Sequence, residues 1–190
     1  MLRFVEPDLD IVVGAANGEP TRVIDALEAA CESLNNVRLH QMIALRARSY
    51  IDGRRPNLRH VSWFLSPMTR DAFHRGACDL VPNSFSDVPR LMRQSLAPRL
   101  VLAAGSAPDR HGYFSLGTDA DYTAALIGEV PFFVEVNHRM PRTFGGNQLH
   151  VSDVVGFCES DIELAELPSL RATARDHRIA ELVADARARR

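Results

Sequence analysis

The sequence predicts an α/β domain built on an open, mostly parallel sheet with helices on both faces. Short apolar segments alternate along the chain with segments whose apolar residues recur every three or four positions, the period of one helix face. The segments 99–105 and 131–137 are apolar almost throughout, which is typical of parallel strands buried on both faces. This alternation favours a parallel sheet because each helix returns the chain to the start of the next strand.

The first part of the chain contains three expected strands and one helix. An apolar run predicts a strand over 10–14, and Pro20 suits the first turn of the helix that follows. Apolar residues at helical spacing predict that helix over 21–34. Two further apolar runs predict strands over 37–43 and 59–65, joined by a loop rich in Arg, Gly and Pro.

The rest of the chain continues the alternation. Ser66 is a good helix cap and Pro67 suits the first helical turn, so a short helix is expected over 66–77. The other expected elements are a brief strand over 78–82, a second capped helix over 84–96, strands over 99–104 and 131–136, and a helix with an Arg-rich end over 169–190.

The composition of the chain limits which partners it is expected to bind and in which compartment it is expected to lie. The 190 residues are 46% hydrophobic and 24% charged, which fits one globular domain over 1–190 with room for a core. The formal net charge of −2 gives no indication of an excess of positive charge that would bind nucleic acid or an anionic membrane. No apolar run is long enough to span a bilayer, and the N-terminus lacks the pattern of a signal peptide, so a cytoplasmic protein is expected.

The cysteines and the basic residues exclude several chemistries. The three cysteines lie far apart without a CxxC pair, so we expect reduced, structural thiols and no metal or redox role. All 22 basic residues are Arg. The absence of Lys excludes a P-loop lysine, a Schiff base and a lysine nucleophile.

Sequence motifs exclude further classes of site. There is no GxSxG for a hydrolase triad, and Gly14 and Gly18 are too sparse for a dinucleotide fingerprint. The seven histidines never form HExxH, and His138 with His150 makes only a weak zinc pair. No metal site is therefore expected.

Four polar segments follow or flank the ends of predicted strands: 17–20, 106–117, 135–143 and 145–153. Because ligands bind beyond the carboxyl ends of strands in such sheets, we expect these segments to converge at one crevice. Residues from all four segments should then lie on the same side of the sheet, namely Glu19, His111, Glu135, Asn137 and Asn147.

Glu135 stands inside the apolar segment FFVEVN. Burying a carboxylate is costly unless it is paired or hydrogen-bonded. Two interpretations stay open: an ion pair with one of the many arginines, or a side chain that faces a ligand.

The order of several segments resembles the acetyl-CoA hydrolase/transferase family, which includes acetate CoA-transferases and 4-hydroxybutyrate CoA-transferase. The resemblance covers nearly the whole chain. Its most specific parts are the PDRHGYFSLG and EVNxxMPRT segments, and it also includes NGEPTRVIDAL, FHRGACDLVPNSFSDVPRL, GGNQLHVSD and the acidic ESDIELAEL.

The resemblance implies an α/β half of the NagB/RpiA/CoA-transferase-like type, in agreement with the pattern of elements. Members of the family are about twice as long and consist of two related halves, so the chain resembles the N-terminal half and lacks the C-terminal catalytic half. In the family the nucleophile is a glutamate of that second half, and Glu135 does not match it. The resemblance therefore assigns no catalytic residue here.

The resemblance also implies substrates and partners. Acyl-CoA and a carboxylate would be the substrates, with coenzyme A as a substrate and no covalently bound cofactor. The partner would be the C-terminal half, a second subunit or another copy of the chain. The chain alone should have little activity.

The resemblance places the loop 105–118 at the cleft that faces the other half. Gly112 and Gly117 allow close backbone approach, while Ser115 and backbone amides would hold a carboxylate or carbonyl oxygen. His111 either donates to the same group or, with Asp109, only stabilises the loop. The same pair of interpretations applies to the turn at 145–147 and to His150. The residues expected at the cleft are Glu19, His111, Gly112, Ser115, Glu135, Asn137, Gly146, Asn147 and His150.

The sequence is compatible with two different functions. The chain is either part of an acyl-CoA:carboxylate CoA-transferase or acyl-CoA hydrolase, or it is a non-catalytic, stand-alone α/β protein with a ligand-binding or structural role.

Overall fold

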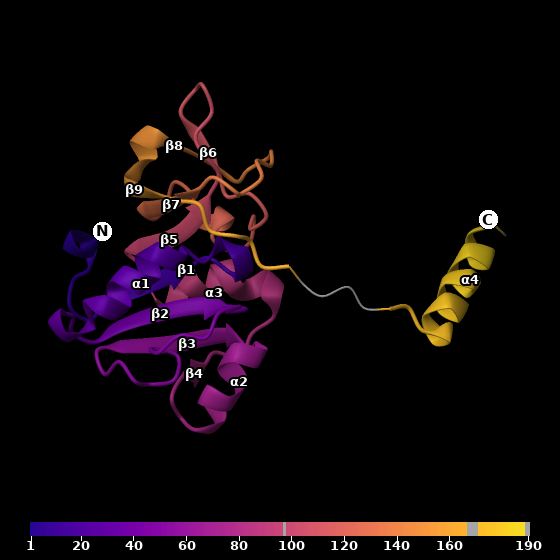
Figure 1. Cartoon of the computed structure of the whole chain (residues 1–190), viewed down its shortest axis with the longest axis horizontal. Coiled ribbons are helices and arrows are strands. Elements are labelled where there is room, and N and C mark those ends of the chain that lie inside the picture. The colour runs from indigo at the N-terminus through magenta and orange to yellow at the C-terminus, as the bar shows by residue number, and fades with distance from the viewer. Residues whose placement is uncertain (97, 167–170, 189–190) are drawn as a thin grey trace.

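A seven-stranded, fully parallel sheet forms the centre of the molecule (Figure 1). The computed structural model describes residues 1–96, 98–166 and 171–188. The strand order is β4-β3-β2-β1-β5-β7-β9. These strands are β1 (Asp10–Val13), β2 (Val37–Met42), β3 (Leu58–Phe64), β4 (Asp79–Leu80), β5 (Leu100–Gly105), β7 (Phe132–Asn137) and β9 (Val154–Ser160).

The structure confirms the predicted fold class and the predicted central strands. Expected strands over 10–14, 37–43, 59–65, 99–104 and 131–136 each agree within about one residue at either end with β1, β2, β3, β5 and β7. The brief strand expected over 78–82 is β4. All neighbouring strands of this sheet pair in parallel, as the uninterrupted apolar segments predicted.

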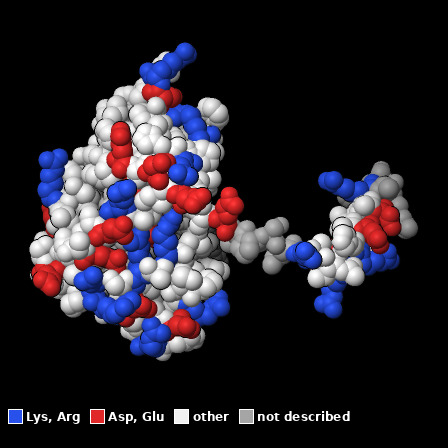
Figure 2. Space-filling view, in the orientation of Figure 1, with Lys and Arg blue, Asp and Glu red and all other residues white. Residues whose placement is uncertain are grey.

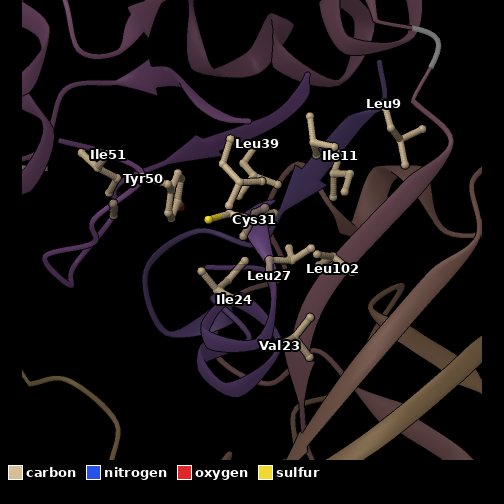
Figure 3. Close-up of a cluster of buried hydrophobic side chains, with 14 of the residues drawn as sticks. Leu9, Ile11, Val23, Ile24, Leu27, Cys31, Leu39, Tyr50, Ile51 and Leu102 are labelled. Atoms are coloured by element: carbon tan, nitrogen blue, oxygen red, sulfur yellow. The ribbon is translucent and has the colours of Figure 1, made fainter. Parts of the chain in front are cut away.

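Helices α1 (Thr21–Ala29) and α2 (Pro67–His74) cover one face of the sheet. Figure 3 shows Val23, Ile24 and Leu27 of α1 beside buried side chains of β1, β2 and β5. Ile24 and Leu27 are completely buried, which accounts for the helical spacing of apolar residues in this segment. Side chains along each strand alternate between the two faces of the sheet, so Ile11 and Val13 join this core whereas Val12 points to the opposite face.

The opposite face is covered by α3 (Val88–Ser95) and by a two-stranded antiparallel sheet. That small sheet pairs β6 (Tyr113–Ser115) with β8 (Gln148–His150). Val88 and Met92 of α3, together with Phe114, complete the second core. Helices thus lie on both faces of the large sheet, as predicted.

The predicted helices differ from the observed ones at their ends. The first was expected over 21–34, but α1 ends at Ala29 and a separate 3₁₀ turn carries the buried Cys31. Ser66 caps α2, because its hydroxyl oxygen accepts a hydrogen bond from the Met68 amide, as expected. The expected cap at the start of 84–96 was wrong, because a 3₁₀ turn over Phe85–Asp87 precedes α3 and no side chain caps either element.

Helix α4 (Ala174–Ala188) forms within the segment expected to be helical over 169–190. Residues 169–170 and 189–190 of that expectation lie outside the described residues. Every side chain over 171–187 is exposed. The apolar Ile179, Leu182 and Val183 are each more than half exposed, so this helix buries none of its apolar residues within the described part of the chain.

Acidic and basic side chains are intermixed over the visible face of the molecule (Figure 2). Many are paired across elements, as in Arg93 with Glu129 and Arg59 with Asp79. No helix in the described part of the chain is long and apolar enough to cross a membrane.

Candidate functional site

The sheet has a topological switch point between β1 and β5. From β1 the chain moves outward through β2, β3 and β4, whereas β5, β7 and β9 extend in the opposite direction. The loops that leave β1 and β5 therefore separate at their carboxyl ends and leave room between them, which is where ligands bind in open α/β sheets. The polar segments singled out in the sequence follow these strands.

The loop after β1 has a constrained backbone. A Cβ added to Gly14 would lie 2.4 Å from the carbonyl oxygen of Gly18, so only glycine fits there. Ala16 has a φ of 46°, and its amide donates to the carbonyl of Ile43, whose own φ is 47°. Left-handed backbone at Ala and at a β-branched residue is costly, and such strain concentrates at functional sites.

Glu19 is held in a buried ion-pair network. Its side chain is fully buried, and the Nη2 of Arg48 lies 2.7 Å from its Oε1. Arg48 Nε donates to the same oxygen, and Gln41 donates to Oε2 at 2.9 Å. Arg48 also pairs with Asp25 and lies 3.7 Å from Glu28. Glu19 therefore joins the loop after β1 to the loop after β2, and its carboxylate is already fully engaged.

Two aspartates tie the segment 117–123 to the loop after β1. Asp121 Oδ2 accepts the Ala15 amide at 3.1 Å, and its Oδ1 accepts from the amide and hydroxyl of Thr123. Asp119 packs so closely on Gly18 that a Cβ there would lie 2.8 Å from the Cβ of Asp119. Burial raises the pKa of Asp119 to about 7, although the hydroxyl of Thr118 donates to its carboxylate.

Ser115 organises the junction between the loop after β5 and the turn after β7. Its hydroxyl donates to the Thr143 carbonyl at 2.9 Å and accepts from the amides of Gly117 and Thr143. Asn147 donates to the hydroxyl of Thr143 at 2.7 Å, and its buried side-chain oxygen has no partner in the described part of the chain. These contacts make Ser115 a fixed part of the loop architecture.

His111 lies at the exposed tip of the loop that precedes β6. Asp109 accepts the amides of His111 and Tyr113 and pairs with Arg142 at 2.9 Å. Gly112 has a φ of 83°, and a Cβ there would lie 2.9 Å from His150 Nε2. His150 in turn donates from this nitrogen to the His111 carbonyl. The tip is therefore rigid, and the side chain of His111 remains exposed.

Glu135 stabilises the start of α1. It is 1% exposed, and its Oε2 accepts the amides of Arg22 and Val23 at 2.8 and 3.2 Å. These are two of the free N–H groups of the helix N-terminus, where a carboxylate also complements the helix dipole. Neither interpretation from the sequence describes this contact: the carboxylate has no arginine side-chain partner in the described part of the chain, and it is directed at a helix end.

Asn137 and Asn17 hold the chain after β9 against the carboxyl edge. Asn137 exchanges hydrogen bonds with both backbone groups of Ile162, and Asn17 does the same with Ala165. Gly146 differs, because an added Cβ there would meet no described atom within 4 Å. Gly146 thus lies open beside the junction.

The structure brings the polar loop after β5 and the polar turn after β7 together. The loop 105–118 and the turn 137–147 pack directly through Ser115 with Thr143 and through Asp109 with Arg142. Glu19, Glu135 and Asn137 each belong to a separate set of contacts, so a single cleft lined by all the expected residues stays a prediction. Among the described residues, no group of three or more His, Cys, Asp or Glu side chains could hold a metal ion.

Sequence reasoning missed Arg48, Asp119 and Asp121. Arg48 is one of 22 arginines, and nothing in its local sequence marks it as buried. The two aspartates stand in a loop whose length and polarity were noticed, but their burial comes from packing on the distant Gly18 and Ala15.

The sequence and the fold both match known proteins. Residues 1–165 match the family model of the acetyl-CoA hydrolase/transferase N-terminal domain. The chain belongs to the acetyl-CoA hydrolase/transferase family. It is 34% identical over 151 residues to the succinyl-CoA:cyclohexane-1-carboxylate CoA transferase of Geobacter metallireducens, covering 79% of this chain and 35% of that protein. It is 32% identical over 166 residues to the 4-hydroxybutyrate coenzyme A transferase of Clostridium kluyveri, covering 86% and 39%.

Solved structures support the assignment to the acetyl-CoA hydrolase/transferase family. RipA from Yersinia pestis superposes with a TM-score of 0.86 at 26% identity, over 95% of this chain and 45% of that protein. A 4-hydroxybutyrate CoA-transferase from Porphyromonas gingivalis gives 0.65 at 25% identity, over 87% and 38%. The chain therefore spans less than half of each of these four proteins. Nothing in these matches favours the alternative of a stand-alone, non-catalytic protein.

Proposed function

We propose that the chain is the N-terminal domain of an acyl-CoA:carboxylate CoA-transferase or an acyl-CoA hydrolase, and that it lines the cleft for CoA and the acyl group. The observation that carries the proposal is the match of residues 1–165 to the family's N-terminal domain. Two relatives are named as CoA transferases, and the chain spans only 35% and 39% of them. Coenzyme A is a substrate here, and no covalently bound cofactor is needed.

The chemistry requires a nucleophile that we place in the C-terminal half. A glutamate carboxylate attacks the acyl-CoA carbonyl and expels the CoA thiolate, which leaves a mixed anhydride. The thiolate then attacks the glutamyl carbonyl, so that a glutamyl-CoA thioester forms and the free acid departs. The acceptor carboxylate, or water in a hydrolase, completes the cycle.

The N-terminal domain holds the substrate in position. The constrained loop after β1 and the junction of 105–118 with 137–147 lie beyond the carboxyl ends of adjacent strands. Holding the reacting groups in one geometry contributes a large part of the rate in such reactions. His111 is exposed and Gly146 is open, so these two are the expected substrate-facing residues. Glu19, Ser115, Glu135 and Asn137 hold the walls of the cleft.

A chimaera tests this function. Residues 1–165 replace the matching N-terminal part of the Clostridium kluyveri transferase, and acetyl-CoA turnover is assayed with and without a second carboxylate. We expect turnover by the chimaera and none by the 190-residue chain alone. A dependence on the carboxylate identifies a transferase, and turnover in its absence identifies a hydrolase.

Borohydride trapping of the glutamyl thioester locates the nucleophile. The chimaera should be trapped in its C-terminal part. Robust turnover by the isolated chain, abolished in Glu135→Gln, would contradict the proposal and make Glu135 the nucleophile.

A further inference from the structure

A cavity of about 610 Å³ is lined by residues of the N-terminal segment, α1, β7 and β9, and by none from the loops that leave β1 and β5. Its walls are mainly apolar and include Phe4, Val23, Ala26, Phe133 and Cys158. A volume of this size and a lining of this kind are typical of sites for small organic molecules.

The cavity exists because α1 covers only part of its sheet face. Val23 and Leu27 pack on the core, whereas Ala26 on the flank of the helix is exposed and lines the cavity. On the far side Phe4 packs on Phe133, with ring centroids 6.4 Å apart. Gly156 has no room for a side chain, because a Cβ would lie 2.9 Å from the Phe133 ring. The hollow is therefore bounded by well-packed groups.

The rim of the cavity carries two arginines that lack an acidic partner. Arg3 and Arg22 line it, both are exposed, and neither has a carboxylate within 4.0 Å in the described part of the chain. The guanidinium of Arg3 lies 4.8 Å from the centroid of the Phe4 ring. By contrast, Arg38, Arg59 and Arg93 on the same domain are all ion-paired.

Two acidic groups lie near the rim, and neither is ion-paired with Arg3 or Arg22 in the described part of the chain. Glu159 lines the cavity with its side chain 70% exposed, and its carboxylate lies 3.7 Å from the imidazole of His138. Glu135 pairs in register with Cys158 and points its carboxylate at the amides of Arg22 and Val23. The rim therefore offers two free guanidinium groups above an apolar floor, which is complementary to an anion with an apolar tail.

We propose that this cavity binds an organic carboxylate with an unbranched apolar chain of several carbons. The carboxylate accepts hydrogen bonds from Arg3 and Arg22, since a guanidinium matches the two oxygens of a carboxylate. The chain lies against Phe4, Val23 and Phe133, where each added methylene strengthens binding about fourfold until the cavity is filled. This site is separate from the cleft at the carboxyl ends of β1 and β5.

Calorimetry with octanoate tests the site on the 190-residue chain. We expect one octanoate per chain, bound at least tenfold more tightly than butyrate and than the neutral octanol. Ala26→Phe fills the cavity and should weaken octanoate at least tenfold, whereas Ala29→Phe, also exposed on α1 but outside the cavity, should leave it unchanged. Arg22→Gln should weaken binding about fivefold, and Arg54→Gln serves as its control.

Amide chemical shifts distinguish this site from the cleft. Octanoate should shift resonances of residues 3–4, 22–26 and 156–159 in the wild type, and those shifts should be lost in Ala26→Phe. Shifts confined to the loop 14–20, equal affinities for octanoate and octanol, or no measurable binding would each overturn the proposal. None of these readouts depends on turnover, so they stand apart from the assay of the chimaera.

Discussion

Two buried titratable side chains have no ion-pair partner in the described part of the chain, and they respond to pH in opposite directions. His60 is completely buried and neither ring nitrogen has a hydrogen-bond partner there. Burial lowers its pKa to about 3, since a charged imidazole would lose its hydration. Burial likewise raises the pKa of Asp119 to about 7. Each group favours its neutral form in the folded state.

Replacing His60 should remove part of the sensitivity to acid. Because the pKa of His60 is about 3 when folded and 6.5 when unfolded, the unfolded chain binds more protons between these values. The contribution of neutral His60 to stability is fully present above pH 6.5. Below that pH, the free energy of unfolding falls by about 1.4 kcal/mol per pH unit. When the pH is lowered from 7 to 5, the free energy of unfolding of His60→Leu should therefore fall by about 2 kcal/mol less than that of wild type, as measured by urea unfolding. The exposed His74→Gln should follow wild type; an equal loss in His60→Leu would contradict the assignment.

Replacing Asp119 should stabilise the protein at high pH. Its folded pKa of about 7 lies above the value of 3.8 for an unperturbed aspartate, so the folded state binds more protons in this window and stability is lost as the pH rises through it. Asp119→Asn cannot ionise, and its free energy of unfolding relative to wild type should increase by about 4 kcal/mol between pH 4 and pH 8. The exposed Asp71→Asn is the control for urea titrations at both pH values. A pH-independent difference would show that Asp119 ionises normally.

At the scale of elements, the sequence identified the buried central strands and the short edge strand β4, and it missed the edge strand β9 and the small strands β6 and β8. β5 and β7 are buried along their whole length, so an uninterrupted apolar pattern marked them. β9 is an edge strand with Gly156 and with a half-exposed Phe157, and β6 and β8 have three residues each. Such strands lack a clear period because pairing with distant partners creates them.

The contacts of the candidate site were less predictable than the fold. The sequence marked Glu135 as unusual, yet its partners are amides 112 and 113 residues away, at the start of α1. Composition also could not select Arg48 from 22 arginines as the partner of Glu19. Long-range polar contacts depend on the packed structure, whereas apolar periodicity is a local property.

Glu135 should act as the N-terminal cap of α1. Glu135→Gln keeps an oxygen acceptor but loses the charge that complements the helix N-terminus, so the free energy of unfolding should fall by about 1–2 kcal/mol. Glu135→Leu leaves two buried amides without an acceptor and should cost about 3 kcal/mol. Hydrogen exchange should quicken in the first turn of α1. The exposed Glu129→Gln, which loses only its surface pairing with Arg93, should leave the free energy of unfolding close to that of wild type; equal effects of the changes at Glu129 and Glu135 would exclude a capping role.

For the whole molecule, the carboxyl ends of β2, β3 and β4 form an incompletely covered surface. Ile43 follows β2, Phe64 ends β3, Met68 lies in the first turn of α2 and Phe85 follows β4, and their side chains are 38% to 63% exposed. Exposed apolar side chains concentrated at one edge indicate an interaction surface. The chain spans less than half of its relatives, so the remainder of such a protein is the partner we expect there.

Replacing two of these side chains should reveal that contact. In sedimentation velocity the 190-residue chain should self-associate with rising concentration, because Phe64 and Phe85 are 57% and 63% exposed and removing them from water is favourable. The double variant Phe64→Ser, Phe85→Ser should remain monomeric, whereas Val151→Ser, at 41% exposure outside this edge, should behave as wild type. The same double change in the chimaera should lower turnover about tenfold by loosening the contact between its halves, with the unfolding temperature of the N-terminal domain little changed. A wild-type chain that stays monomeric, together with a chimaera unaffected by the double change, would show that this edge is not where the second half docks.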